Sequence, residues 1–196
     1  MREIVLFAED YGHEEFLKSL LSRFADENGI AVAIQGLSVR GGHGKVVSEF
    51  RQFMKDLRRA QKHLPDLLVV ASDANCKGLM ELRKEIEEVI DEEMKSFVIH
   101  AIPDPHIERW LLLDPAAFKT VLGRGCKAPD LKCSRDRYKK ALLDEMQDAR
   151  VSPPLGGIEY AHDIVAAMDL KAVEHADPSI KQLIRDLRSK FNKWKC

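Results

Sequence analysis

Short apolar runs alternate with helix-patterned segments through the first hundred residues, and this alternation constrains the fold more than any other feature. The runs, which we expect to be strands, lie at 3–8, 30–37, 67–71 and 97–101. Between them, apolar residues recur three and four positions apart, as on the buried face of an amphipathic helix. Strand–helix–strand units of this kind give right-handed crossovers and a parallel sheet. The sequence therefore predicts an α/β protein with a doubly wound, mostly parallel sheet.

An acidic residue ends two of the expected strands. Glu9 follows the first apolar run, and Asp73 follows the run at 67–71, within Asp73-Ala74-Asn75. Open α/β sheets bind ligands at the carboxyl ends of their strands, and carboxylate oxygens there suit a divalent metal ion. Either acid alone could instead be a helix N-cap. The two together, on neighbouring strands, favour a shared site.

The pattern changes after residue 101. Residues 124–140 contain seven Lys or Arg and two Asp, and most of the rest of the chain has helical periodicity. The segment 153–157, Pro-Pro-Leu-Gly-Gly, is typical of a linker. We expect an α/β domain over 1–123. Residues 124–196 would form a basic loop and a helical appendage packed on that domain.

Composition excludes several classes of protein. The chain has 196 residues and a formal net charge of −1, so any contact with nucleic acid must be local. No stretch approaches the roughly 20 apolar residues of a membrane span, and the chain enters its first strand without a signal-peptide pattern. Four cysteines are too few for a disulfide scaffold. We therefore expect a cytoplasmic protein with reduced thiols and no membrane contact.

The strand ends, together with Glu-Arg-Trp-Leu-Leu at 108–112, resemble the Toprim fold. More narrowly, they are similar to small stand-alone Toprim-like proteins and to nuclease domains of the overcoming-lysogenization-defect type. The resemblance covers about residues 1–115. It implies a nuclease that cleaves DNA with Mg²⁺ or Mn²⁺. Glu9 would handle the proton and help to hold the metal, Asp73 would be the main metal ligand, and Asn75 would stand in place of a second acid.

The resemblance also implies a setting. Such proteins often work beside an ATPase partner, in defence against phage or other foreign DNA. Three residues depart from the family pattern: Asn75 is neutral, Asp10 replaces a glycine, and His13 replaces an acid. These departures leave open a catalytically degenerate Toprim-like module that binds or regulates through a protein partner.

Glu108 is a candidate third carboxylate, because it follows the fourth expected strand and so could face the same sheet edge. Its alternative is an ordinary position on a helix surface. Candidate nucleic-acid contacts are Arg40 and Lys45, which bound a glycine-rich loop, and Arg135, Arg137 and Lys140 in the basic segment. Glycines permit close backbone approach to phosphate, but the loop lacks P-loop spacing. It could be a flexible turn, or serve a phosphate-transferring α/β enzyme. The basic segment could be only a solvated surface. The sequence leaves the oligomeric state open.

Overall fold

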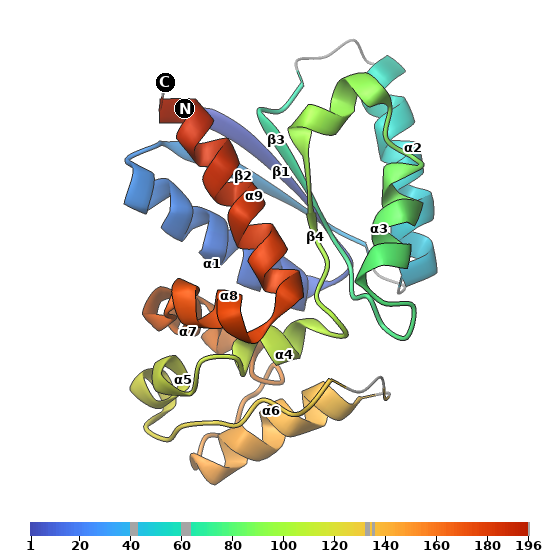
Figure 1. Cartoon of the computed structure of the whole chain (residues 1–196). Helices are drawn as coiled ribbons and strands as arrows, with labels where there is room; N and C mark the ends of the chain where they lie inside the picture. The colour runs from blue at the N-terminus through green and yellow to red at the C-terminus, as the bar shows by residue number, and fades with distance from the viewer. Residues whose placement is uncertain (40–42, 60–63, 132–133, 135, 196) are drawn as a thin grey trace.

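A parallel sheet lies at the centre of the molecule (Figure 1). The computed structural model describes residues 1–39, 43–59, 64–131, 134 and 136–195. The sheet has the order β2-β1-β3-β4, and each neighbouring pair in it is parallel. Its strands are β1 (Arg2–Ala8), β2 (Val32–Ser38), β3 (Leu67–Ala71) and β4 (Val98–Ala101). The predicted α/β class with a doubly wound parallel sheet is confirmed.

Helices cover both faces of this sheet. In chain order the described helical elements are α1 (Tyr11–Asn28), α2 (His43–Arg59), α3 (Leu79–Glu87), the 3₁₀ turn η1 (Glu92–Phe97), α4 (Ile107–Leu111), α5 (Pro115–Leu122), α6 (Arg137–Asp148), η2 (Ile158–Tyr160), α7 (Ala161–Ala167), α8 (Leu170–Ala176) and α9 (Pro178–Lys195). Figure 1 shows α1 and α9 on one side of the sheet and α2 and α3 on the other.

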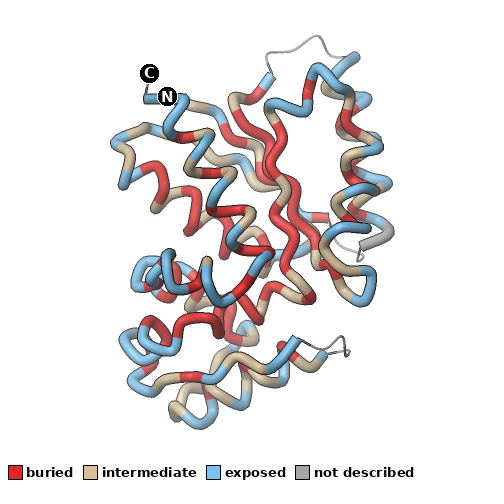
Figure 2. Tube along the Cα trace, viewed as in Figure 1, coloured by how far each residue is buried: buried red, intermediate tan, exposed pale blue. Residues whose placement is uncertain are grey.

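Strand β3 explains why the sheet is doubly covered. All five of its residues are buried, and alternate strand residues point to opposite faces. Val69 packs in the hydrophobic cluster that includes α1 and α9, whereas Val70 packs in the cluster that includes α2 and α3. Figure 2 shows the resulting run of buried residues along the strands. A strand buried on both faces is expected to be apolar throughout, as this one is.

The C-terminal part of the chain joins the main core. Helix α9 lies against α1, where the rings of Phe191 and Phe24 have centroids 5.7 Å apart. Phe191, Phe24 and Leu6 of β1 belong to one hydrophobic cluster. The boundary expected near residue 123 therefore falls between segments that share a core. Among the described residues, no helix combines the length and apolar character needed to cross a membrane.

The cysteines differ from the expectation of reduced thiols. Cys76 is disulfide-bonded, so that expectation is wrong at this residue. Cys126 is a free, buried thiol. Burial raises its pKa to about 12, which makes it unreactive at neutral pH.

Candidate active site at the carboxyl edge of the sheet

Glu9 and Asp73 lie side by side at the carboxyl edge of the sheet. Glu9 directly follows β1, Asp73 lies two residues beyond the end of β3, and these two strands are paired neighbours. The backbone N–H of Asp73 donates to Oε2 of Glu9 at 3.0 Å, and Ser72 Oγ donates to the same oxygen at 2.6 Å. The structure thus brings together the two acids that the strand pattern singled out.

The Asp73 carboxylate is surrounded by N–H donors. Its Oδ1 accepts from His13 Nε2 at 2.9 Å and from the Ile107 backbone at 2.9 Å. Its Oδ2 accepts from His106 Nδ1 at 2.8 Å. Burial acts to raise the pKa of Asp73, but the two imidazoles outweigh burial and lower it. Asp73 is therefore an ionised carboxylate held by two histidines.

His13 links two carboxylates from within the first turn of α1. Asp10 caps this helix by accepting from the His13 backbone N–H at 3.0 Å, and its Oδ1 also lies 2.8 Å from His13 Nδ1. The other ring nitrogen faces Asp73, so both nitrogens carry a proton. Burial opposes that charge, yet the two carboxylates raise the pKa of His13 well above its usual value. In turn, His13 outweighs burial and lowers the pKa of Asp10 to about 2.

His106 and Glu108 come from the segment after β4. Among the described residues, none bonds to Nε2 of His106, whose Nδ1 faces Asp73. The hydrogen bond to Asp73 raises the pKa of His106. Burial, reinforced by the negative charge of Asp73, raises the pKa of Glu108. A histidine with a raised pKa and a carboxyl that resists ionisation therefore stand beside Asp73, in addition to His13.

Helix α6 closes one side of this site. The ring of Tyr138 lies beside that of His106, with centroids 5.7 Å apart. Lys139 and Glu108 both line a cavity of about 220 Å³ that also touches Asp10. The basic segment thus supplies a lysine close to the acidic cluster, although not one of the three basic residues chosen from the sequence.

The remaining sequence candidates are placed less centrally. Asn75 donates from Nδ2 to the Asp73 carbonyl at 3.0 Å and lines a different cavity with Asp104. Lys45 is in the first turn of α2 and pairs with Glu49 at 3.2 Å. Arg137 pairs with Asp130, and Lys140 is exposed on α6. Arg40 and Arg135 lie outside the described residues.

The donor arrangement does not fit the implied magnesium ion. Asp73, its expected main ligand, already has both oxygens engaged by N–H groups, two of them from histidines. Within the described ranges, no group of three or more His, Cys, Asp or Glu side chains is placed to hold a metal. The metal cofactor stays a prediction from the resemblance.

Sequence reasoning missed the role of the histidines. His13 was noted only as a departure from the family pattern, and His106 was not assigned to the site. A signal was present for each: His13 lies one helical turn after Glu9, and His106 lies two residues before Glu108. Neither signal shows which carboxylate the imidazole contacts.

The fold and the site together define an α/β protein with carboxylates and imidazoles clustered at the carboxyl edge of its sheet. The chain belongs to the family described as a domain of unknown function (DUF4276), whose family model matches residues 8–188. The matched region includes Glu9, Asp73 and Glu108. A comparison with curated proteins gave no match, and neither did a comparison with solved structures.

Proposed function

We propose that this chain is a nuclease of Toprim type that cleaves DNA phosphodiesters at the edge formed by β1 and β3. The observation that supports this most is the convergence of Glu9, Asp73, His106 and Glu108 on one sheet edge. Carboxylate and imidazole groups are the side chains that most often act as general acids and bases in enzymes. Lys139 beside Glu108 would attract a phosphate group.

His106 would act as the general acid. Asp73 holds its Nδ1, which leaves Nε2 to face substrate, and the raised pKa favours the protonated ring. Orientation of a catalytic imidazole by a buried aspartate is a recurrent device in enzymes. Glu9 would take a proton from the attacking water. The new P–O bond would form as the old one breaks, and His106 would donate its Nε2 proton to the leaving oxygen.

The setting of this activity follows from the resemblance. Cleavage of foreign DNA would take place in the cytoplasm and in concert with an ATPase partner. The resemblance implies Mg²⁺ or Mn²⁺, whereas both oxygens of Asp73 are held by imidazoles. The assay must therefore be run both with a chelator and with added metal.

Plasmid cleavage tests the proposal. We expect nicking or linearisation by the wild-type chain, loss of cleavage in Glu9→Gln and His106→Ala, and unchanged cleavage in His162→Ala, a matched histidine on α7. Parallel runs in EDTA and in Mn²⁺ establish whether metal takes part. Absence of cleavage in both conditions would contradict the proposal.

The second candidate is a catalytically degenerate module that acts through a protein partner. The observation that favours it is His13, whose imidazolium occupies the place of a family acid and neutralises Asp73. Protection of cells against phage separates the two functions. Protection that survives Glu9→Gln and Asp73→Asn favours the module, whereas protection lost in both favours the nuclease.

A further inference from the structure

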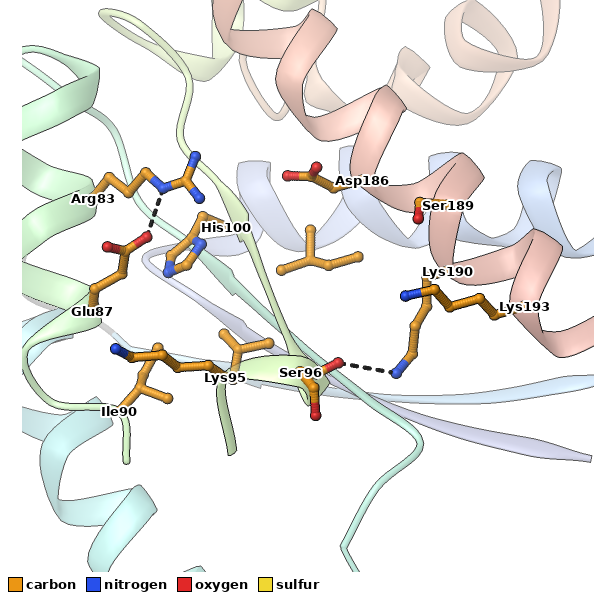
Figure 3. Close-up of a pocket in the computed structure, with 12 residues that line it drawn as sticks. Arg83, Glu87, Ile90, Lys95, Ser96, His100, Asp186, Ser189, Lys190 and Lys193 are labelled. Carbon is orange, nitrogen blue, oxygen red and sulfur yellow. Dashed lines mark hydrogen bonds and ion pairs between the residues drawn. The ribbon is translucent and has the colours of Figure 1, made fainter. Parts of the chain in front are cut away.

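A cavity of about 370 Å³ lies at the outer edge of the sheet, away from Glu9 and Asp73. It is bounded by α3, η1, β4 and the second half of α9 (Figure 3). Figure 3 shows His100 of β4 between Arg83 on one side and Asp186 on the other. None of its lining residues belongs to the candidate active site.

Positive charge in this cavity is only partly neutralised. Arg83 pairs with Glu87 at 2.7 Å, and Lys95 pairs with Glu92, which is not part of the lining. Lys193 forms no hydrogen bond or ion pair with any residue that the structure describes. It therefore offers a charged donor to a ligand.

Lys190 lies beside Lys193 on α9 and is also without a carboxylate partner among the described residues. Its Nζ donates to the Ser96 carbonyl at 3.4 Å and lies 5.4 Å from the centre of the Phe97 ring. Burial lowers the pKa of Lys190, and the charge of Lys193 adds to this effect although Asp66 opposes it. An anion placed between the two ammonium groups would relieve their repulsion.

A buried polar atom marks the inner wall. Nε2 of His100 is buried and has no hydrogen-bond partner among the described residues. Burial, with Arg83, lowers the pKa of His100 to about 4, so the ring is neutral at pH 7. Buried polar atoms in proteins usually have a partner. A polar group of a ligand would supply it once the atoms that cover this nitrogen shift, because the nitrogen itself has almost no exposed surface.

We propose that this cavity binds a small phosphate monoester of about mononucleotide size. Its phosphate would lie on Lys190 and Lys193, and a polar group of its organic part would bond to His100. The volume is within the range of small-molecule sites, and two ammonium groups match the charge of a phosphate monoester. Ile90, Val98 and Ile99 supply apolar wall for the organic part. Glu87 of α3 and Asp186 of α9 also line the cavity, and their negative charges disfavour an extended polyanion.

Calorimetric titration with AMP, ribose 5-phosphate and inorganic phosphate tests the proposal. We expect AMP to bind more tightly than inorganic phosphate. Lys193→Ala should weaken AMP binding by about tenfold or more, as expected when one charge-assisted hydrogen bond is removed. Lys181→Ala, an exposed lysine on the same helix, should bind AMP as the wild type does.

His100→Leu separates the two halves of the ligand. It should weaken AMP binding while leaving the affinity for inorganic phosphate unchanged, because only the organic part contacts His100. Three results would each overturn the proposal. The first is that none of these compounds binds at millimolar concentration, and the second is that AMP binds equally to wild type and Lys193→Ala. The third is that Lys193→Ala weakens the binding of a single-stranded oligonucleotide and of no other ligand. Plasmid cleavage by Lys193→Ala should equal that of the wild type, so this test is independent of the nuclease proposal.

Discussion

His13 joins two carboxylates that would otherwise repel each other. One ring nitrogen faces Asp10 and the other faces Asp73, which lies sixty residues further along the chain. A buried imidazolium is tolerated only because both neighbours are negative. This pairing could not be predicted from the sequence, because it depends on how β1 and β3 pair and not on local spacing. His13, which in the sequence suggested a catalytically degenerate site, therefore organises the carboxylates of this site.

The lowered pKa of His100 can be tested through the pH dependence of stability. Its folded-state pKa is about 4, below the usual 6.5, because burial and Arg83 outweigh Glu87 and Asp186. A depressed histidine pKa adds stability that is fully present above pH 6.5 and is lost as pH falls toward 4. At about 1.4 kcal/mol per pKa unit, the loss should reach up to about 3 kcal/mol.

Urea denaturation between pH 4 and 8 checks this expectation. The unfolding free energy of the wild type minus that of His100→Leu should fall as pH falls through that window. Thr120→Ala, an exposed change that removes no titratable group, is the control and should keep a constant difference from the wild type. A constant difference for His100→Leu as well would show that His100 titrates normally.

The strands were predictable as elements because each is a short apolar run ended by polar residues. The start of α1 was less predictable from the sequence, because Asp10 is both a helix cap and a partner of His13. The short helix α4 carries Glu108, and its position depends on Ile107 N–H donating to Asp73. Such a contact between distant segments leaves no periodic signal. Strand ends were therefore predicted well, whereas the loop after β4 was not.

Helix α9 gives a prediction at the scale of elements. Asp177 caps it by accepting from the N–H groups of Ser179 and Ile180, and it also pairs with buried Arg109. Asp177→Ala should cost about 3–5 kcal/mol of unfolding free energy, because it leaves a buried guanidinium unpaired. Asp169→Ala removes only the cap of α8 and should cost about 1 kcal/mol. Equal losses in urea denaturation would contradict this account of α9.

The C-terminal helices share the larger of the two hydrophobic cores with α1 and the sheet, and this arrangement could not be read from the sequence. The helical periodicity of 178–191 predicted an apolar face, but not that the face would pack on α1 and β4. Packing of this kind is decided by the tertiary fold. The basic segment similarly folds back, so that Tyr138 reaches His106. The C-terminal segment therefore completes both the core and one side of the site.

Measurements of DNA binding test whether the basic segment contacts DNA. Arg135, Arg137 and Lys140, changed together to Glu, should weaken binding and make it less sensitive to salt. Removal of a single phosphate interaction should lower the salt slope by about 0.9. Fluorescence anisotropy over a salt series measures both the affinity and this slope. The control changes Lys171, Lys181 and Arg185, which are exposed on α8 and α9, to Glu. An equal effect of both triple changes would mean that only net charge matters.

Chemical rescue of His106 tests whether its imidazole is the group that gives a proton to the leaving oxygen. The measurement is the rate of plasmid cleavage by His106→Gly with and without added imidazole. We predict that the substitution abolishes cleavage and that imidazole restores part of it, while His162→Gly cleaves normally and does not respond. Full activity of His106→Gly without imidazole would contradict the account.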